Sequence, residues 1–142
     1  MIRIMLDSNI IISGIVFSGN ERKLLNNIYS KGLILILNDY IVIEVESVIQ
    51  KKFPKHKLIF QTLIDQLIVE FNPIPSIDMI DRAKLIIRDP KDAVILASAI
   101  DAKLDYFVSG DLDFHTNDVC AHVNVVNTIR AIDLIGQDLM NE

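Results

Sequence analysis

Short runs of aliphatic and β-branched residues alternate with longer segments of helical periodicity along the whole chain. Each run is bounded by polar or turn-forming residues and therefore predicts a strand. The predicted strands cover residues 2–6, 33–37, 69–74, 106–108 and 123–126. Strands that are separated by helices form mostly parallel sheets covered on both faces. The alternation therefore predicts an α/β fold with a central, mostly parallel twisted sheet.

Residues that typically begin or end helices support the prediction of helices between these strands. The predicted helices cover residues 21–30, 40–53, 58–68, 77–87, 90–102 and 129–135. Asn38 or Asp39 can cap the second of them, and Asp89 suits the cap of the helix that begins at Pro90. Pro73 cannot join a central ladder, so we expect the strand that contains it at an edge. With no repeat and no linker-like stretch, residues 1–142 are expected to form a single domain.

The composition predicts a folded protein of the cytoplasm. The 142 residues are 51% hydrophobic and 23% charged, which excludes a disordered tail or a collagen-like fibre. The single cysteine, Cys120, excludes an internal disulfide and a cysteine-based zinc site, and we expect it to be at least half-buried. No stretch approaches the ~18 unbroken apolar residues of a membrane span, so we expect no membrane partner. The net charge of −5 argues against indiscriminate binding to nucleic acid.

Acidic residues follow the predicted strands at the points where ligands bind in parallel sheets. Asp7 follows the first strand, and Asp111 and Asp113 follow the strand at 106–108. Asp92 falls in the first turn of the helix that begins at Pro90. A fifth acid comes from the helix at 40–53, where either Glu44 or Glu46 could face the cleft, because each lies at one margin of the apolar stripe.

Several carboxylates in one pocket repel each other unless a cation or protons offset their charge. Mg²⁺ or Mn²⁺ suits such a pocket, because these hard ions bind a few carboxylate oxygens together with water and substrate phosphates. A pocket of carboxylates without cysteine or histidine ligands therefore indicates phosphodiester chemistry more than zinc hydrolysis.

The order of these motifs resembles that of the PIN-domain nucleases, and more narrowly that of the VapC-like toxin components of toxin–antitoxin pairs. The similarity extends over essentially the whole chain and includes Asp7-Ser8-Asn9, the basic stretch at 51–56, Arg88-Asp89-Pro90 and Ser109-Gly110-Asp111. The resemblance implies a three-layer α/β/α sandwich and Mg²⁺- or Mn²⁺-dependent cleavage of single-stranded RNA. It further implies inhibition by a cognate antitoxin protein and a homodimer.

The resemblance also implies roles for individual residues. Asp7, Glu44, Asp92 and Asp111 match the family's acidic quartet, and this match selects Glu44 over Glu46. Asp113 matches an auxiliary acid that some members use as a further metal ligand. The small polar residues of the family's motifs correspond to Ser8, Asn9 and Ser109.

Structural roles compete with each of these functional ones. Asp7 and Asp111 could shape turns, Asp92 could serve the helix terminus, and Glu44 could be a solvated helix residue. A group of basic residues lies at and after the end of the helix predicted at 40–53: Lys51, Lys52, Lys55 and Lys57. They could guide an RNA backbone or an antitoxin, or they could simply be solvated residues at a helix terminus.

Two rival functions remain open from the sequence. The same fold could bind RNA or protein without catalysis. An aspartyl-phosphate phosphatase is the other alternative, because Asp7 also ends a first strand, but that chemistry usually needs an acid at position 9, where this chain has Asn9.

Overall fold

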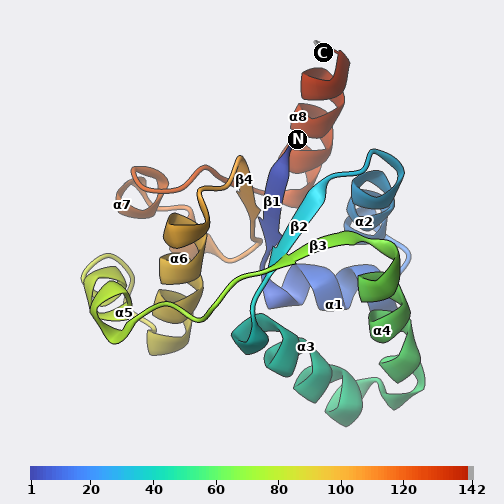
Figure 1. The fold of residues 1–142 in the computed structure, drawn as a ribbon, viewed down its shortest axis with the longest axis horizontal. Helices are drawn as coiled ribbons and strands as arrows, with labels where there is room; N and C mark the ends of the chain where they lie inside the picture. Colours follow the sequence, from blue (N-terminus) through green and yellow to red (C-terminus); the bar gives the residue numbers. More distant parts are fainter. Residues whose placement is uncertain (141–142) are drawn as a thin grey trace.

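A five-stranded parallel sheet forms the centre of the molecule in the computed structural model, which describes residues 1–140 (Figure 1). The strand order is β3-β2-β1-β4-β5, and every neighbouring pair is parallel. The strands are β1 (Arg3–Leu6), β2 (Ile34–Leu37), β3 (Ile68–Phe71), β4 (Tyr106–Val108) and β5 (Val125–Val126). The first strand and the fourth thus lie side by side at the centre, and the predicted parallel sheet is confirmed.

Helices cover both faces of this sheet, as the α/β/α prediction requires (Figure 1). On one side α1 packs against α2 and α3, and α2 packs against α8, whereas α5 and α6 pack together on the other side. The α-helices are α1 (Ser8–Val16), α2 (Asn20–Ser30), α3 (Asp39–Lys52), α4 (Lys57–Gln66), α5 (Ile77–Lys84), α6 (Pro90–Ala102), α7 (Asn117–Cys120) and α8 (Thr128–Met140). Two short 3₁₀ turns are η1 (Pro54–His56) and η2 (Leu112–Phe114). Over the described residues, none of these helices is both long and apolar enough to cross a membrane.

The core is built from the central strands and the turn that follows them. Met5 and Leu6 of β1 and Phe107 of β4 are fully buried, as expected for strands covered on both faces. Phe114 of η2 is also fully buried and packs edge-to-face on Phe107, with ring centroids 5.1 Å apart. This contact fixes η2 to the core at the end of β4.

Side-chain caps define where two of the helices begin. Asn38, rather than Asp39, caps α3, because its Oδ1 accepts a hydrogen bond from the Ile41 N–H at 3.0 Å. Its Nδ2 donates to the Ser98 Oγ of α6 at 2.8 Å, so the start of α3 is tied to α6. The predicted cap of α6 is confirmed, because the Asp89 Oδ1 accepts from the Lys91 N–H at 2.8 Å.

Three features differ from the sequence expectations. Helix α1 was not predicted, because its isoleucine run is buried almost all round and shows no alternation of polar and apolar residues. Strand β3 ends at Phe71, so Pro73 lies beyond the ladder rather than within an edge strand. Cys120 is exposed at the end of α7, where we expected it to be at least half-buried. The short helix α7 begins at the Thr116 cap, whose hydroxyl accepts from the Val119 N–H.

Candidate functional site

The carboxyl ends of β1 and β4 place Asp7 beside Ser109. Leu6 pairs with Val108 in the sheet, and the Asp7 N–H continues the ladder by donating to the Val108 carbonyl at 2.9 Å. The Ser109 Oγ donates to the Asp7 Oδ2 at 2.9 Å. Two residues that are far apart in sequence are therefore joined at one edge of the sheet.

Ser109 connects Asp7 to the turn that carries the next two acids. Its side chain is fully buried, and its Oγ also accepts the Asp111 N–H at 3.1 Å. The Ser109 carbonyl lies 2.7 Å from the His115 Nε2, a contact that requires this ring nitrogen to carry the proton. Ser109 is thus held from three directions, and its hydroxyl positions the Asp7 carboxylate relative to Asp111.

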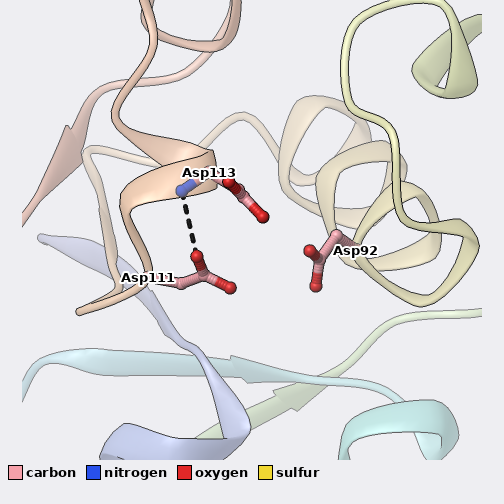
Figure 2. A group of neighbouring side chains, drawn as sticks. All are labelled: Asp92, Asp111 and Asp113. Atoms are coloured by element: carbon pink, nitrogen blue, oxygen red, sulfur yellow. Dashed lines mark hydrogen bonds between the residues drawn. The ribbon is translucent and has the colours of Figure 1, made fainter.

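Asp92, Asp111 and Asp113 bring their carboxylates together (Figure 2). One oxygen from each lies within 4.8 Å of the other two. Asp111 precedes η2, and its Oδ1 accepts from the Asp113 N–H at 2.9 Å, so these two acids share one tight turn. Asp92 faces them from the first turn of α6. We call Asp92, Asp111 and Asp113 the three-carboxylate group.

The surroundings of Asp92 disfavour its charged form. Its pKa is raised from 3.8 to about 6, first by burial and then by the negative charges of Asp89, Asp111, Asp7 and Asp113. A bound cation would reverse this balance, because it stabilises the ionised carboxylates that now repel each other. The pKa of Asp92 therefore supports a cation site at the three-carboxylate group.

Asp7 lies deeper than the three-carboxylate group and is under opposing influences. Burial raises its pKa, and the charge of Asp111 adds to that effect. The hydrogen bonds from the Ser109 hydroxyl and the Ser8 backbone act in the opposite direction, because they stabilise the carboxylate. Asp7 and the three-carboxylate group therefore interact electrostatically at the same edge of the sheet.

A comparison with protein-family models matches the PIN domain over residues 3–113. This chain belongs to the PIN domain family. The matched segment includes every acid discussed above and accounts for more than half of the chain. The resemblance inferred from the sequence motifs is confirmed. A comparison with curated protein sequences finds no significant match.

Solved structures share the fold of this PIN domain at low sequence identity. VapBC2 from Rickettsia felis, bound to a promoter DNA fragment, aligns with a TM-score of 0.65 and 14% identity, covering 89% of this chain and 98% of that chain. DNA-bound VapBC from Salmonella typhimurium aligns with a TM-score of 0.65 and 16% identity, covering 90% and 99%. FitAcB from Neisseria gonorrhoeae aligns with a TM-score of 0.60 and 16% identity, covering 89% and 98%. These matches show that the fold is shared over about nine-tenths of this chain.

Glu44 is not part of the three-carboxylate group, but its charge and that of Asp92 both act on Tyr40. Glu44 is half-buried, whereas Glu46 is exposed. Tyr40 lies one helical turn before Glu44, and its pKa is raised first by burial and then by the charges of Glu44, Asp89 and Asp92. Tyr40 is therefore within electrostatic range of Glu44 on α3 and of the acids at the start of α6. Its spacing of four residues from Glu44 is the one signal in the sequence that could have indicated it.

The small polar residues after Asp7 have different environments. Ser8 is fully buried, and its Oγ has no hydrogen-bond partner among the described residues. Asn9 is exposed on α1. Asp7 is the N-cap residue of α1 but makes no side-chain cap bond, because its carboxylate is turned to Ser109 instead.

The basic residues named from the sequence lie at the opposite end of α3 from the α6 contact. All four are exposed: Lys51, Lys52, Lys55 and Lys57. Asn38 contacts α6 at the start of α3, and Lys51 lies thirteen residues later, which is about 20 Å along a helix. These side chains therefore lie at the far end of α3 from its contact with α6.

The donors present in this PIN domain fit a hard divalent ion. The three-carboxylate group offers oxygen ligands alone, and among the described residues it is the one cluster of acidic, histidine or cysteine side chains with this spacing. Its members lie on two separate segments, α6 and the turn after β4, so the group forms only in the folded chain. Oxygen-only coordination favours Mg²⁺ or Mn²⁺ over zinc.

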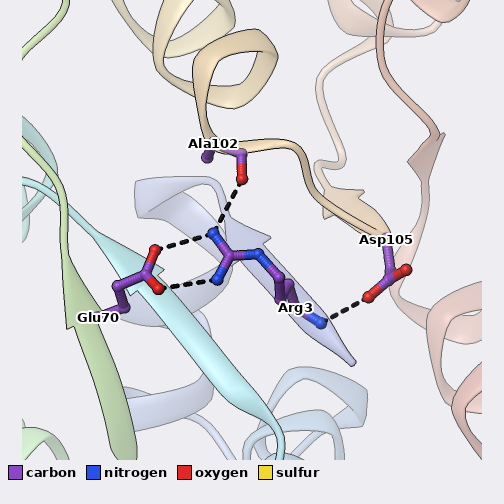
Figure 3. A network of polar contacts seen from close by, with 4 residues as sticks. All are labelled: Arg3, Glu70, Ala102 and Asp105. Atoms are coloured by element: carbon purple, nitrogen blue, oxygen red, sulfur yellow. Dashed lines mark hydrogen bonds and ion pairs between the residues drawn. The ribbon is translucent and has the colours of Figure 1, made fainter. Parts of the chain in front are cut away.

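A second polar network, near the amino end of β1, serves the fold instead (Figure 3). The Arg3 guanidinium makes two parallel hydrogen bonds of 2.8 Å to the Glu70 carboxylate on β3. It also donates to the Ala102 carbonyl at the end of α6, and the Arg3 N–H donates to the Asp105 carboxylate. The network therefore ties the edge strand β3 and the end of α6 to β1.

Glu70→Gln is expected to lower the melting temperature more at pH 7 than at pH 3. The Arg3 guanidinium holds the pKa of Glu70 below its ordinary value of 4.5, so the pair stabilises the fold above that pH and loses its effect as the pH falls through the lowered pKa. Thermal melts at the two pH values test this. The control is Glu46→Gln, which removes an exposed carboxylate that makes no ion pair with any residue in the described part of the chain. Equal melting temperatures of wild type and Glu70→Gln at pH 7 would contradict the assignment.

Proposed function

We propose that this protein is a metal-dependent endoribonuclease that hydrolyses phosphodiester bonds in single-stranded RNA. The observation that carries the proposal is the three-carboxylate group, with Asp7 beside it, at the carboxyl ends of the two central strands. Ligands of parallel α/β folds bind at this position. Membership of the PIN domain family supports the nuclease assignment.

Asp92, Asp111 and Asp113 would hold Mg²⁺ or Mn²⁺, with Asp7 and Glu44 completing the acidic set. Such an ion supplies a Lewis acid that activates water and offsets charge on the reacting phosphate. The chain's own residues keep the carboxylates in place. The Ser109 hydroxyl orients Asp7, the backbone N–H of Asp113 orients Asp111, and Phe114 fixes the turn to the core.

The ionisation of Asp92 matters to this function. With a pKa of about 6, its carboxyl group is mostly ionised at pH 7 to 8 and mostly protonated at pH 5. A protonated Asp92 cannot serve as a full anionic ligand. The metal concentration needed for cutting is therefore expected to rise as the pH drops below about 6, because the proton competes with the cation for Asp92.

We further propose that the protein acts in the cytoplasm as the toxin of a toxin–antitoxin pair, inhibited by a cognate antitoxin protein, and that it forms a homodimer. The likeness of the whole chain to VapBC and FitAB structures supports this role. The sequence motifs of the VapC-like group support it independently.

The test is cleavage of a labelled single-stranded RNA with Mn²⁺ or Mg²⁺. Wild type is expected to cut only with the metal present, and Asp111→Asn should cut about 100-fold more slowly or worse. The amide oxygen of that variant can still accept the Asp113 N–H, so the turn is kept while the charge is lost. Asp133→Asn, an exposed acid on α8, is the control and should cut normally. Normal cutting by Asp111→Asn would refute the proposal, and binding of RNA without any cutting would indicate a non-catalytic module.

A further inference from the structure

An open cleft of about 560 Å³ begins beside the three-carboxylate group. Asp113 and Thr116 line one wall, and the segment that joins α5 to α6 lines the other. Asp113 belongs both to the cleft and to the three-carboxylate group. The cleft is therefore continuous with the proposed reaction centre. Its volume is within the range of pockets that hold a small ligand or a short length of chain.

Arg88 is the cationic side chain that lines this cleft. It is exposed, and within the described part of the chain it forms neither an ion pair nor a side-chain hydrogen bond. Its backbone is fixed on both sides, because Ile87 is buried in the core and Pro90 begins α6. The nearby Asp89 carboxylate is already engaged as the helix cap. Arg88 thus presents a free guanidinium from a fixed position.

We propose that this cleft binds the RNA backbone next to the bond that is cut, with the Arg88 guanidinium contacting a phosphate oxygen. The inference rests on the proposed nuclease function and adds the path of the substrate to it. A polyanion that approaches the acidic edge of a chain with a net charge of −5 is repelled unless cations offset the repulsion. Guanidinium groups bind phosphate through paired hydrogen bonds, which suits this position.

The position of Arg88 favours this cleft over the other exposed basic residues discussed above. The exposed lysines lie at the far end of α3, about 20 Å along the helix from its contact with α6, whereas Arg88 lines the cleft that contains Asp113. The residues that line the cleft include no aromatic side chain, so contacts to the RNA backbone rather than base stacking would hold the strand there. Arg88 therefore holds the backbone without selecting a base, and the contact tolerates different sequences.

Binding of a fluorescent single-stranded RNA tests the inference, with Asp92→Asn as the background so that the RNA stays intact. Adding Arg88→Ala is expected to weaken binding about tenfold and to reduce the slope of log affinity against log salt by about 0.7, the value for one phosphate contact on a single strand. Adding Arg88→Lys should restore part of the affinity, because it keeps the charge but not the paired hydrogen bonds.

The control is Lys31→Ala, which removes one exposed positive charge at the end of α2, before β2 begins and away from the acidic edge. Should Arg88→Ala weaken binding no more than Lys31→Ala does, the cleft assignment is overturned, whether or not wild type cuts RNA. Cutting by wild type is measured separately. If Arg88→Ala loses affinity but wild type shows no metal-dependent cutting, the cleft is supported as an RNA-binding site and the proposed nuclease function is refuted.

Discussion

Asp92→Asn is expected to abolish metal-dependent RNA cutting while making the metal-free protein more stable. The variant removes one of the three carboxylates that would hold the ion, so cutting should fall about 100-fold or more. It also removes a charge that the fold disfavours, because burial and neighbouring acids raise the pKa of Asp92 from 3.8 to about 6. Function and stability are thus expected to change in opposite directions.

The pH dependence of this stability gain follows from the two pKa values. A raised pKa means that the folded state binds the proton more tightly than the unfolded state, so ionisation costs stability above pH 6. The gain in Asp92→Asn should be full above pH 6 and absent below about pH 4. Allowing for solvent screening and for the lost helix-terminus interaction, the gain is about 1 kcal/mol, or roughly 3 °C in melting temperature.

Thermal melts with a chelator at pH 8 and at pH 3.5, together with the cleavage assay, check both parts. Asp101→Asn, an exposed acid in the last turn of the same helix, is the matched control and should keep the activity. Added Mg²⁺ should raise the melting temperature of wild type and of the control but not that of Asp92→Asn. Retained activity in Asp92→Asn, or an equal response to Mg²⁺, would remove this residue from the metal site.

Ser109→Ala is expected to reduce cutting about ten- to 100-fold at pH 7 and to shift the acid limb of the pH profile upward. The Ser109 hydroxyl opposes the rise that burial imposes on the pKa of Asp7, so removing the hydroxyl lets that pKa rise further. The backbone N–H of Asp111 also loses its acceptor. Activity should therefore recover in part as the pH is raised.

Full pH profiles of wild type, Ser109→Ala and Ser109→Thr test this expectation. The threonine variant keeps the hydroxyl and should retain the wild-type profile. A uniform loss in Ser109→Ala with an unshifted profile would indicate that Ser109 supports the fold without acting on Asp7. Melting temperatures of the variants separate this case from simple unfolding.

The sequence allowed the fold to be predicted where local signals agree with tertiary packing. Short apolar runs that end in Asp7 or Ser109 define the central strands, and the Asp89 cap defines the start of α6. Helix α1 could not be predicted because it is buried almost all round, so its isoleucine run shows no alternation of polar and apolar residues.

The sequence allowed the residues of the acidic site to be predicted, but not their complete arrangement in space. Asp111 and Asp113 are brought close by a tight turn, and their positions after β4 already indicated this. The choice between Glu44 and Glu46 depends on how α3 is rotated on the core, which helical periodicity leaves open. Arg88 belongs to the Arg88-Asp89-Pro90 motif, but its place in a cleft could not be predicted, because the opposite wall of that cleft lies more than twenty positions later in the chain.

The pairing of β1 with β4 also has a consequence for the protein during its synthesis. Asp7 emerges from the ribosome early, but its partner Ser109 and the acids of the following turn emerge about a hundred residues later. Domains generally fold as units during translation, and contacts of such long sequence separation form late. A nascent chain that is released before β4 therefore has no assembled reaction centre, and incomplete products should be harmless to the cell that makes them.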